Sequence, residues 1–174
     1  MGAFLDRLRG RPRIQAARIK SVWNSYIQSK ENGDYFFKVV RNVCNRDEGI
    51  RDILLSRNKY SQSEDETDFI LRLLGEKIGT FFQTLLADEV LYNQSEFKRA
   101  CFNMGKQHSD FSTETFKVVY WDEFTLAMLE ELEDSGRVGR DDLRAWQMLL
   151  HLLNESMQEG YFDARAGTQH RNVG

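Results

Sequence analysis

His108 ends an apolar stripe in this sequence. Phe97, Cys101 and Met104 precede it at steps of four, three and four residues. That spacing puts all four side chains on one face of a helix. Histidine is the most common metal ligand among the side chains, but a lone histidine on an apolar face is also compatible with simple packing. The stripe therefore leaves two interpretations, a ligand or a locally bonded core residue.

The remaining histidines and cysteines do not supply a second ligand with metal-site spacing. His151 lies off the apolar stripe of the last expected helix, and His170 lies close to the C-terminus. Cys44 and Cys101 are too few for a disulfide framework, and we expect buried thiols there, with redox sensing as the alternative. Zinc requires three or four protein ligands, whereas haem iron requires one histidine in an apolar pocket. A single buried histidine therefore suits haem b.

The apolar spacing predicts an all-α protein. The chain has one proline, Pro12, and no segment with the alternating pattern of a strand. We expect six long helices plus short helical turns, packed as a globule around a pocket. The expected helices cover approximately 14–28, 35–43, 68–85, 95–111, 115–132 and 141–161, with irregular turns at 44–60 and an acidic loop at 61–68.

Composition limits the function classes. The 174 residues carry a formal net charge of −3, which gives no electrostatic reason to expect nucleic-acid binding. The sequence contains no apolar run long enough for a membrane span, so we expect a cytoplasmic protein. The N-terminal segment is basic, and Gly2 occupies the position that N-myristoylation requires, although Asp6 replaces the preferred Ser or Thr. A solvated tail and a contact with a membrane surface are both compatible with residues 1–13.

Several segments, in the same order along the chain, resemble parts of the globin family, in particular the divergent nematode-type globins of invertebrates. The matching segments are SVWNSY (21–26), GDYFFKVV (33–40), LLGEKIGTFFQTLL (73–86), FNMGKQH (102–108), YWDEFTLAML (120–129) and AWQMLLHLLNESMQEGY (145–161). The resemblance covers approximately 14–161. Because the apolar stripe of the last helix ends at Tyr161, we expect a globin domain over 14–163, with tails at 1–13 and 164–174.

The resemblance also implies a haem pocket with assigned positions. His108 takes the place of the proximal iron ligand, with Met104 one turn before it. Leu74 takes the distal position that usually holds His or Gln, and Ile78 lies one turn later on the same side. Further implied positions are Lys77 toward a haem propionate, Ile50 where the family almost always has Phe, and Phe36 above the bound ligand. Phe116, Trp121 and Phe124 would line the pocket from the helix that follows His108.

The function implied is that of a haem globin that binds O2, NO or CO or transfers electrons, in gas or redox sensing or signalling. Leu74 cannot donate a hydrogen bond, and an unpaired buried polar ligand loses about 1–3 kcal/mol. The expected pocket therefore favours CO and NO over the stable oxygen binding that oxygen transport requires. No general acid or base is evident, so any peroxidase or nitrite-reductase activity is expected to be weak.

Two other interpretations belong to different function classes. A haem-free globin-fold regulatory module would use the pocket for an apolar ligand, or only as core, and its helices for a protein partner. An unrelated helical-bundle adaptor would contact membrane through its basic N-terminus. Hemin binding separates both of them from the haem interpretation.

Overall fold

The regular secondary structure in the described part of the chain is all helical, without a strand. The computed structural model describes residues 14–29, 34–56 and 63–171. The predicted all-α class is therefore confirmed. The helices are α2 (Ala16–Val22), the π-helical turn η1 (Trp23–Ile27), α3 (Tyr35–Arg46), α4 (Glu48–Ser56), α5 (Glu64–Leu85), α6 (Asp88–Leu91), α7 (Gln94–His108), α8 (Val119–Asp134) and α9 (Arg140–Arg171).

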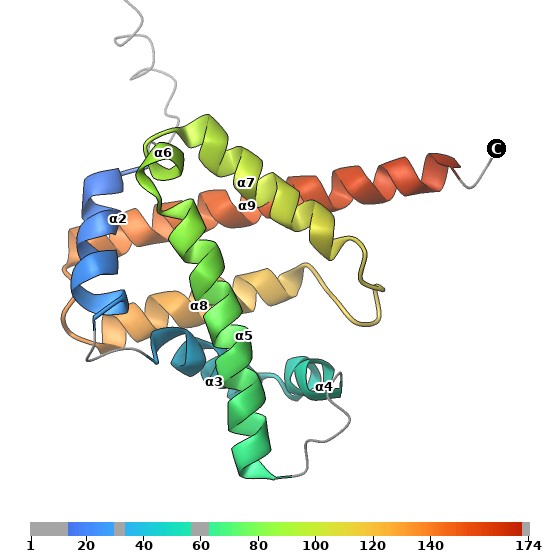
Figure 1. Cartoon of the computed structure of the whole chain (residues 1–174), viewed down its shortest axis with the longest axis horizontal. Helices are drawn as coiled ribbons and strands as arrows, with labels where there is room; N and C mark the ends of the chain where they lie inside the picture. The colour runs from blue at the N-terminus through green and yellow to red at the C-terminus, as the bar shows by residue number, and fades with distance from the viewer. Residues whose placement is uncertain (1–13, 30–33, 57–62, 172–174) are drawn as a thin grey trace, which may run out of the picture.

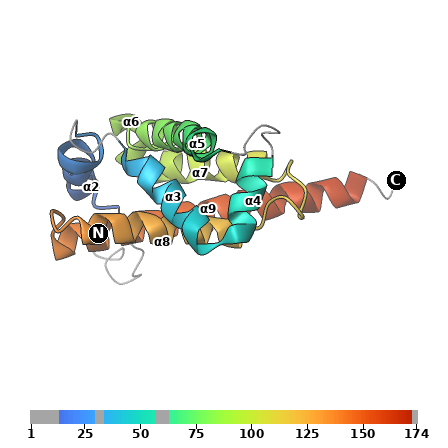
Figure 2. The same ribbon diagram turned by 90° about the horizontal axis from the view of Figure 1, so that it is seen from below.

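The helices form two layers joined by α3. Seen from below, α5, α6 and α7 lie above α8 and α9, and α2 lies at one end (Figures 1 and 2). Helix α3 packs against both α5 and α8, so it connects the layers. The core between them contains fully buried Phe97 and Trp146, which bring α7 and α9 into the main hydrophobic cluster.

Two helix crossings are so close that only glycine fits. A Cβ on Gly75 of α5 would lie 2.9 Å from the backbone nitrogen of Phe37 in α3. A Cβ on Gly105 of α7 would lie 1.9 Å from the carbonyl oxygen of Met157 in α9. Gly160 of α9 meets α7 in the same way. Because backbone atoms cannot rotate away as a side chain can, these glycines set the distances between the helices.

Helix α5 begins earlier than the acidic loop predicted at 61–68 would allow. Its first turn contains Glu64, Asp65 and Glu66, and the hydroxyl of Ser63 accepts a hydrogen bond from the backbone N–H of Glu66. Acidic side chains and a serine cap both stabilise a helix N-terminus. The prediction of a loop over these acidic residues is wrong.

Two further segments are more regular than predicted. Residues 48–56, expected as irregular turns, form the single helix α4. Helix α9 passes Tyr161 and ends at Arg171, so most of the segment predicted as a tail from residue 164 is helical. The side chain of Arg165 donates a hydrogen bond to the carbonyl of Phe111 in the loop between α7 and α8. The last helix therefore still contacts the body of the fold beyond residue 163.

Among the described helices, none combines the length and the apolar character needed to cross a bilayer. The basic segment 1–13, with the predicted myristoylation position Gly2, lies outside the described residues.

Candidate functional site

His108 is the last residue of α7, and its ring is bonded to its own helix. The distance from Nδ1 to the carbonyl oxygen of Met104, four residues earlier, is 2.9 Å. A carbonyl only accepts hydrogen bonds, so in a neutral ring this bond places the proton on Nδ1 and the lone pair on Nε2. Metal-binding histidines commonly have this arrangement, in which a backbone carbonyl fixes the tautomer of the ring.

Three aromatic side chains pack around the imidazole. The ring centroids of Phe111, Phe116 and Trp121 lie 5.6, 5.1 and 5.3 Å from that of His108. Phe111 and Phe116 come from the loop after α7, whereas Trp121 is in the first turn of α8. We call these three residues the aromatic cage. The cage limits rotation of the imidazole and surrounds it with apolar surface.

Partly buried apolar side chains of α4, α5 and α8 pack against the two hydrophobic clusters of the protein. Phe124 follows Trp121 by three residues and therefore shares its face of α8. Phe124, Ile78 and Leu54 each pack against both hydrophobic clusters of the protein, and Leu74 packs against the smaller one. All four of these side chains are only partly buried. The predicted distal residues Leu74 and Ile78 thus lie on an apolar surface that the protein does not fully cover.

The remaining predicted pocket residues lie in varied environments. Ile50 is 1% exposed inside the main cluster, and Met104 is partly buried against that cluster. Lys77 is exposed on α5. Phe36 contacts the rings of Trp23, Tyr35 and Phe82 and does not belong to the aromatic cage. The structure brings Phe116 and Trp121 to His108 but gives Phe36 different aromatic neighbours.

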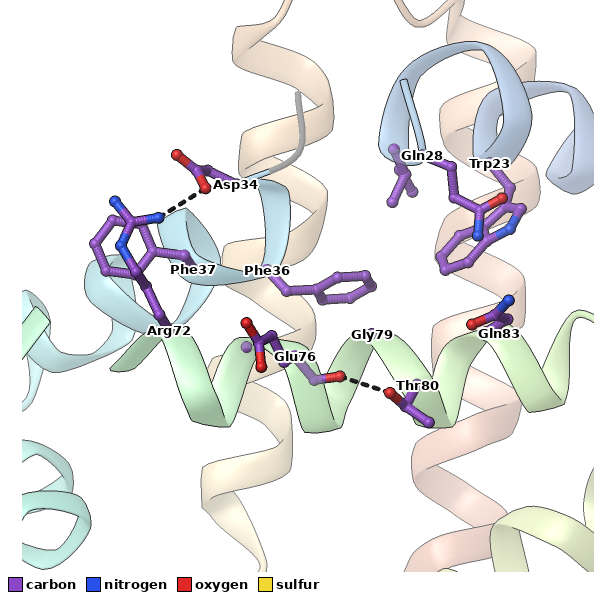
Figure 3. A pocket seen from close by; sticks show the side chains of 12 residues that line it. Trp23, Gln28, Asp34, Phe36, Phe37, Arg72, Glu76, Gly79, Thr80 and Gln83 are labelled. Atoms are coloured by element: carbon purple, nitrogen blue, oxygen red, sulfur yellow. Dashed lines mark hydrogen bonds and ion pairs between the residues drawn. The ribbon is translucent and has the colours of Figure 1, made fainter. Parts of the chain in front are cut away.

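Phe36 instead lines a groove that the sequence did not indicate. This groove of about 650 Å³ lies between η1, α3 and α5 (Figure 3). Arg72 at its rim pairs with Asp34 at 2.7 Å and covers the ring of Phe37. The α5 residues that line the groove include Arg72, Glu76, Gly79 and Gln83. Arg72 and Glu76 each precede a residue of the Leu74 and Ile78 stripe by two positions, which is about 200° around a helix.

Tyr35 is buried, and its hydroxyl contacts the protein backbone. It donates a hydrogen bond to the carbonyl oxygen of Met128, at 2.8 Å. Burial raises the pKa of the Tyr35 hydroxyl well above its ordinary value. The tyrosine that lies next to Phe36 in the sequence therefore directs its polar group toward α8.

Both cysteines are buried thiols, as expected. Burial raises the pKa of Cys44 to about 11 and that of Cys101 to about 12. The thiolate is the reactive form of cysteine, so these thiols are poorly suited to redox sensing.

The described residues contain no group of three or more His, Cys, Asp or Glu side chains that could together hold a metal ion. Haem iron needs a single protein ligand, so the haem prediction does not depend on such a group.

A scan against protein-family models finds no match for this sequence, and a search of curated proteins finds none either. The functional interpretation therefore depends on the site itself.

Proposed function

We propose that the chain is a globin that binds haem b through Nε2 of His108 and uses it to bind a diatomic gas or to transfer an electron in sensing or signalling. The observation that carries this proposal is the bond from Nδ1 of His108 to the Met104 carbonyl, because it orients Nε2 as a ligand. When bound, haem would supply an iron centre that can coordinate a gas or change oxidation state.

In this proposal, the apolar residues next to His108 and along α5 and α8 would hold the macrocycle. Helix α5 contributes partly buried Leu74 and Ile78, and α8 contributes Trp121 and Phe124. Partly buried apolar side chains from several helices are the kind of lining that a macrocycle would cover. Lys77, exposed on α5 one residue before Ile78, would supply the positive charge for a propionate.

The same residues favour ligands that need no hydrogen bond. Leu74 and Ile78 have no donor, and the Tyr35 hydroxyl donates to Met128. Bound oxygen would therefore lack the polar contact that stabilises it, whereas CO and NO depend less on such a contact. We infer that the chain acts in gas or redox sensing rather than in oxygen transport.

Hemin titration of the purified protein tests the proposal. We expect saturable binding at one hemin per chain with a sharp Soret band, and a pyridine haemochrome spectrum typical of haem b. His108→Ala should shift or abolish the Soret band. His151→Ala is the matched control, because His151 is exposed on α9. If the wild type does not bind hemin, the proposal is wrong and the haem-free regulatory module becomes the better interpretation.

A further inference from the structure

The ligand-bearing end of α7 lies one turn beyond the closest contact between α7 and α9. An ideal Cβ on Gly105 would lie 1.9 Å from the carbonyl oxygen of Met157, and one on Gly160 would lie 2.0 Å from that of Phe102. The contact is reciprocal, since each glycine faces a carbonyl located three residues before the other glycine. Most of the packing of α7 within the fold is with α9.

The same crossing also supports the aromatic cage. Tyr161 directly follows Gly160 and is 4% exposed. Its ring centroid lies 5.7 Å from that of Phe116 and 6.1 Å from that of Trp121. Both of those rings pack against His108. The α7–α9 crossing is therefore connected to His108 in two ways, through the turn Gly105–His108 and through Tyr161.

We propose that Gly105 and Gly160 are positioning residues, which hold the imidazole of His108 at the depth and orientation needed to bind iron. This inference rests on the proposed haem function. Neither glycine touches the bound group, and each acts by allowing α7 and α9 to meet backbone to backbone.

Alanine at either glycine would force the helices apart. Ordinary contact with a Cβ begins at 3.4 Å, so the Cβ of an alanine at position 160 would be more than about 1 Å too close to the Phe102 carbonyl. The obstacle is backbone, so a rotamer change cannot relieve it. Helix α7 must move away from α9, and His108 must move with α7 relative to the cage.

Hemin affinity of two alanine variants of α9 tests the inference. In Gly160→Ala we expect a hemin dissociation constant about 10–100-fold above that of the wild type, as found when the support of a metal ligand is lost. Gly167→Ala is the matched control, since it lies on the same helix and a Cβ there meets nothing within 4 Å. Wild-type affinity in a folded Gly160→Ala would overturn the inference.

Hydrogen exchange of the wild-type protein provides a test that does not depend on whether Gly160→Ala folds. Coupling between two sites is reciprocal, so binding through His108 must stabilise the crossing that positions it. We expect hemin to increase the protection of amides at both 102–108 and 157–161, and His108→Ala to remove this increase. A hemin-induced increase in protection that is limited to the amides of α7 would contradict the positioning role of the two glycines. Absence of hemin binding in the wild type would instead contradict the proposed function.

Discussion

The sequence indicated the helix face on which His108 lies, but it could not indicate the orientation of the imidazole ring. The apolar stripe predicted a histidine on the apolar face of a helix, and His108 is partly buried as the last residue of α7. The bond between Nδ1 and the Met104 carbonyl depends on the rotamer of His108 and on the exact course of α7. Residue types and spacing do not specify either, so the orientation of the ring had to come from the structure.

A single substitution at Leu74 tests the apolar character of the proposed distal side. Leu74→Gln introduces an amide donor on the partly buried face of α5. One added hydrogen bond is worth about 0.5–1.5 kcal/mol, so the oxygen dissociation rate should fall by about 2- to 10-fold. The CO dissociation rate should change much less, because CO gains little from a donor. Stopped-flow kinetics of the hemin-reconstituted, reduced protein measures both rates, and equal changes for the two gases would contradict this account.

The buried thiols predict a loss of stability at alkaline pH. The pKa of Cys101 is about 12 in the fold, compared with an ordinary value of 9.0. As the pH rises above 9, the unfolded chain loses its thiol protons first, so the free energy of unfolding falls until the folded thiols also titrate.

Urea unfolding from about pH 8 to about pH 11 measures this loss. Cys101→Ala should reduce the slope of the unfolding free energy against pH. The slope is the relevant readout, because the substitution also alters packing and so changes the free energy at every pH. Part of the slope should remain, since the pKa of Cys44 is raised as well. An unchanged slope in Cys101→Ala would show that this thiol titrates at its ordinary pKa.

At the scale of helices, periodicity located the long elements, whereas boundaries required other signals. The start of α5 was missed because its first turn has no apolar residue. Ser63 followed three residues later by Glu66 is nevertheless the sequence signature of a helix start. The extension of α9 has alanine and arginine, which favour helix, but no apolar stripe. The π-helical turn η1 has no comparable signal in the sequence.

The α3–α5 crossing predicts that alanine substitution changes stability differently at two glycines of α5. A Cβ at Gly75 would lie 2.9 Å from backbone, whereas one at Gly79 would lie 3.1 Å from the ring of Phe36. The ring can shift, but the backbone of α3 cannot shift without moving the helix.

Gly75→Ala should therefore be less stable than Gly79→Ala by about 1–3 kcal/mol, the usual range for overpacking. The gain in helix propensity is the same for both variants and cancels in the comparison. Chemical denaturation followed by circular dichroism measures the difference, and equal stabilities would contradict the steric argument.

At the scale of the whole molecule, the contacts of α9 decide where the domain ends. Its C-terminal part projects past the other helices (Figure 1). Arg165 nevertheless donates to the Phe111 carbonyl and lies 5.2 Å from the centre of the Tyr161 ring. Sequence reasoning placed the boundary at residue 163 because the apolar stripe ends at Tyr161, and that criterion does not detect a long polar side chain reaching back.

Two truncated chains test this boundary. A chain that ends after Asp163 loses Arg165, whereas one that ends after Gly167 retains it. A hydrogen bond from a charged group contributes up to about 3 kcal/mol, so the first chain should be measurably less stable than the second. The second should match the full chain in thermal unfolding. Equal melting temperatures for both truncated chains would mean that Arg165 contributes nothing to the fold.

The central claim for the whole molecule is that the imidazole of His108 binds iron. Resonance Raman spectroscopy of the hemin-reconstituted, reduced protein tests it most directly, because the iron–histidine stretching band reports that bond alone. We expect the band in the wild type and in His151→Ala, a shift of the band when histidine is labelled with 15N, and no band in His108→Ala. A wild-type protein without the band, or a band that persists in His108→Ala, would contradict the assignment.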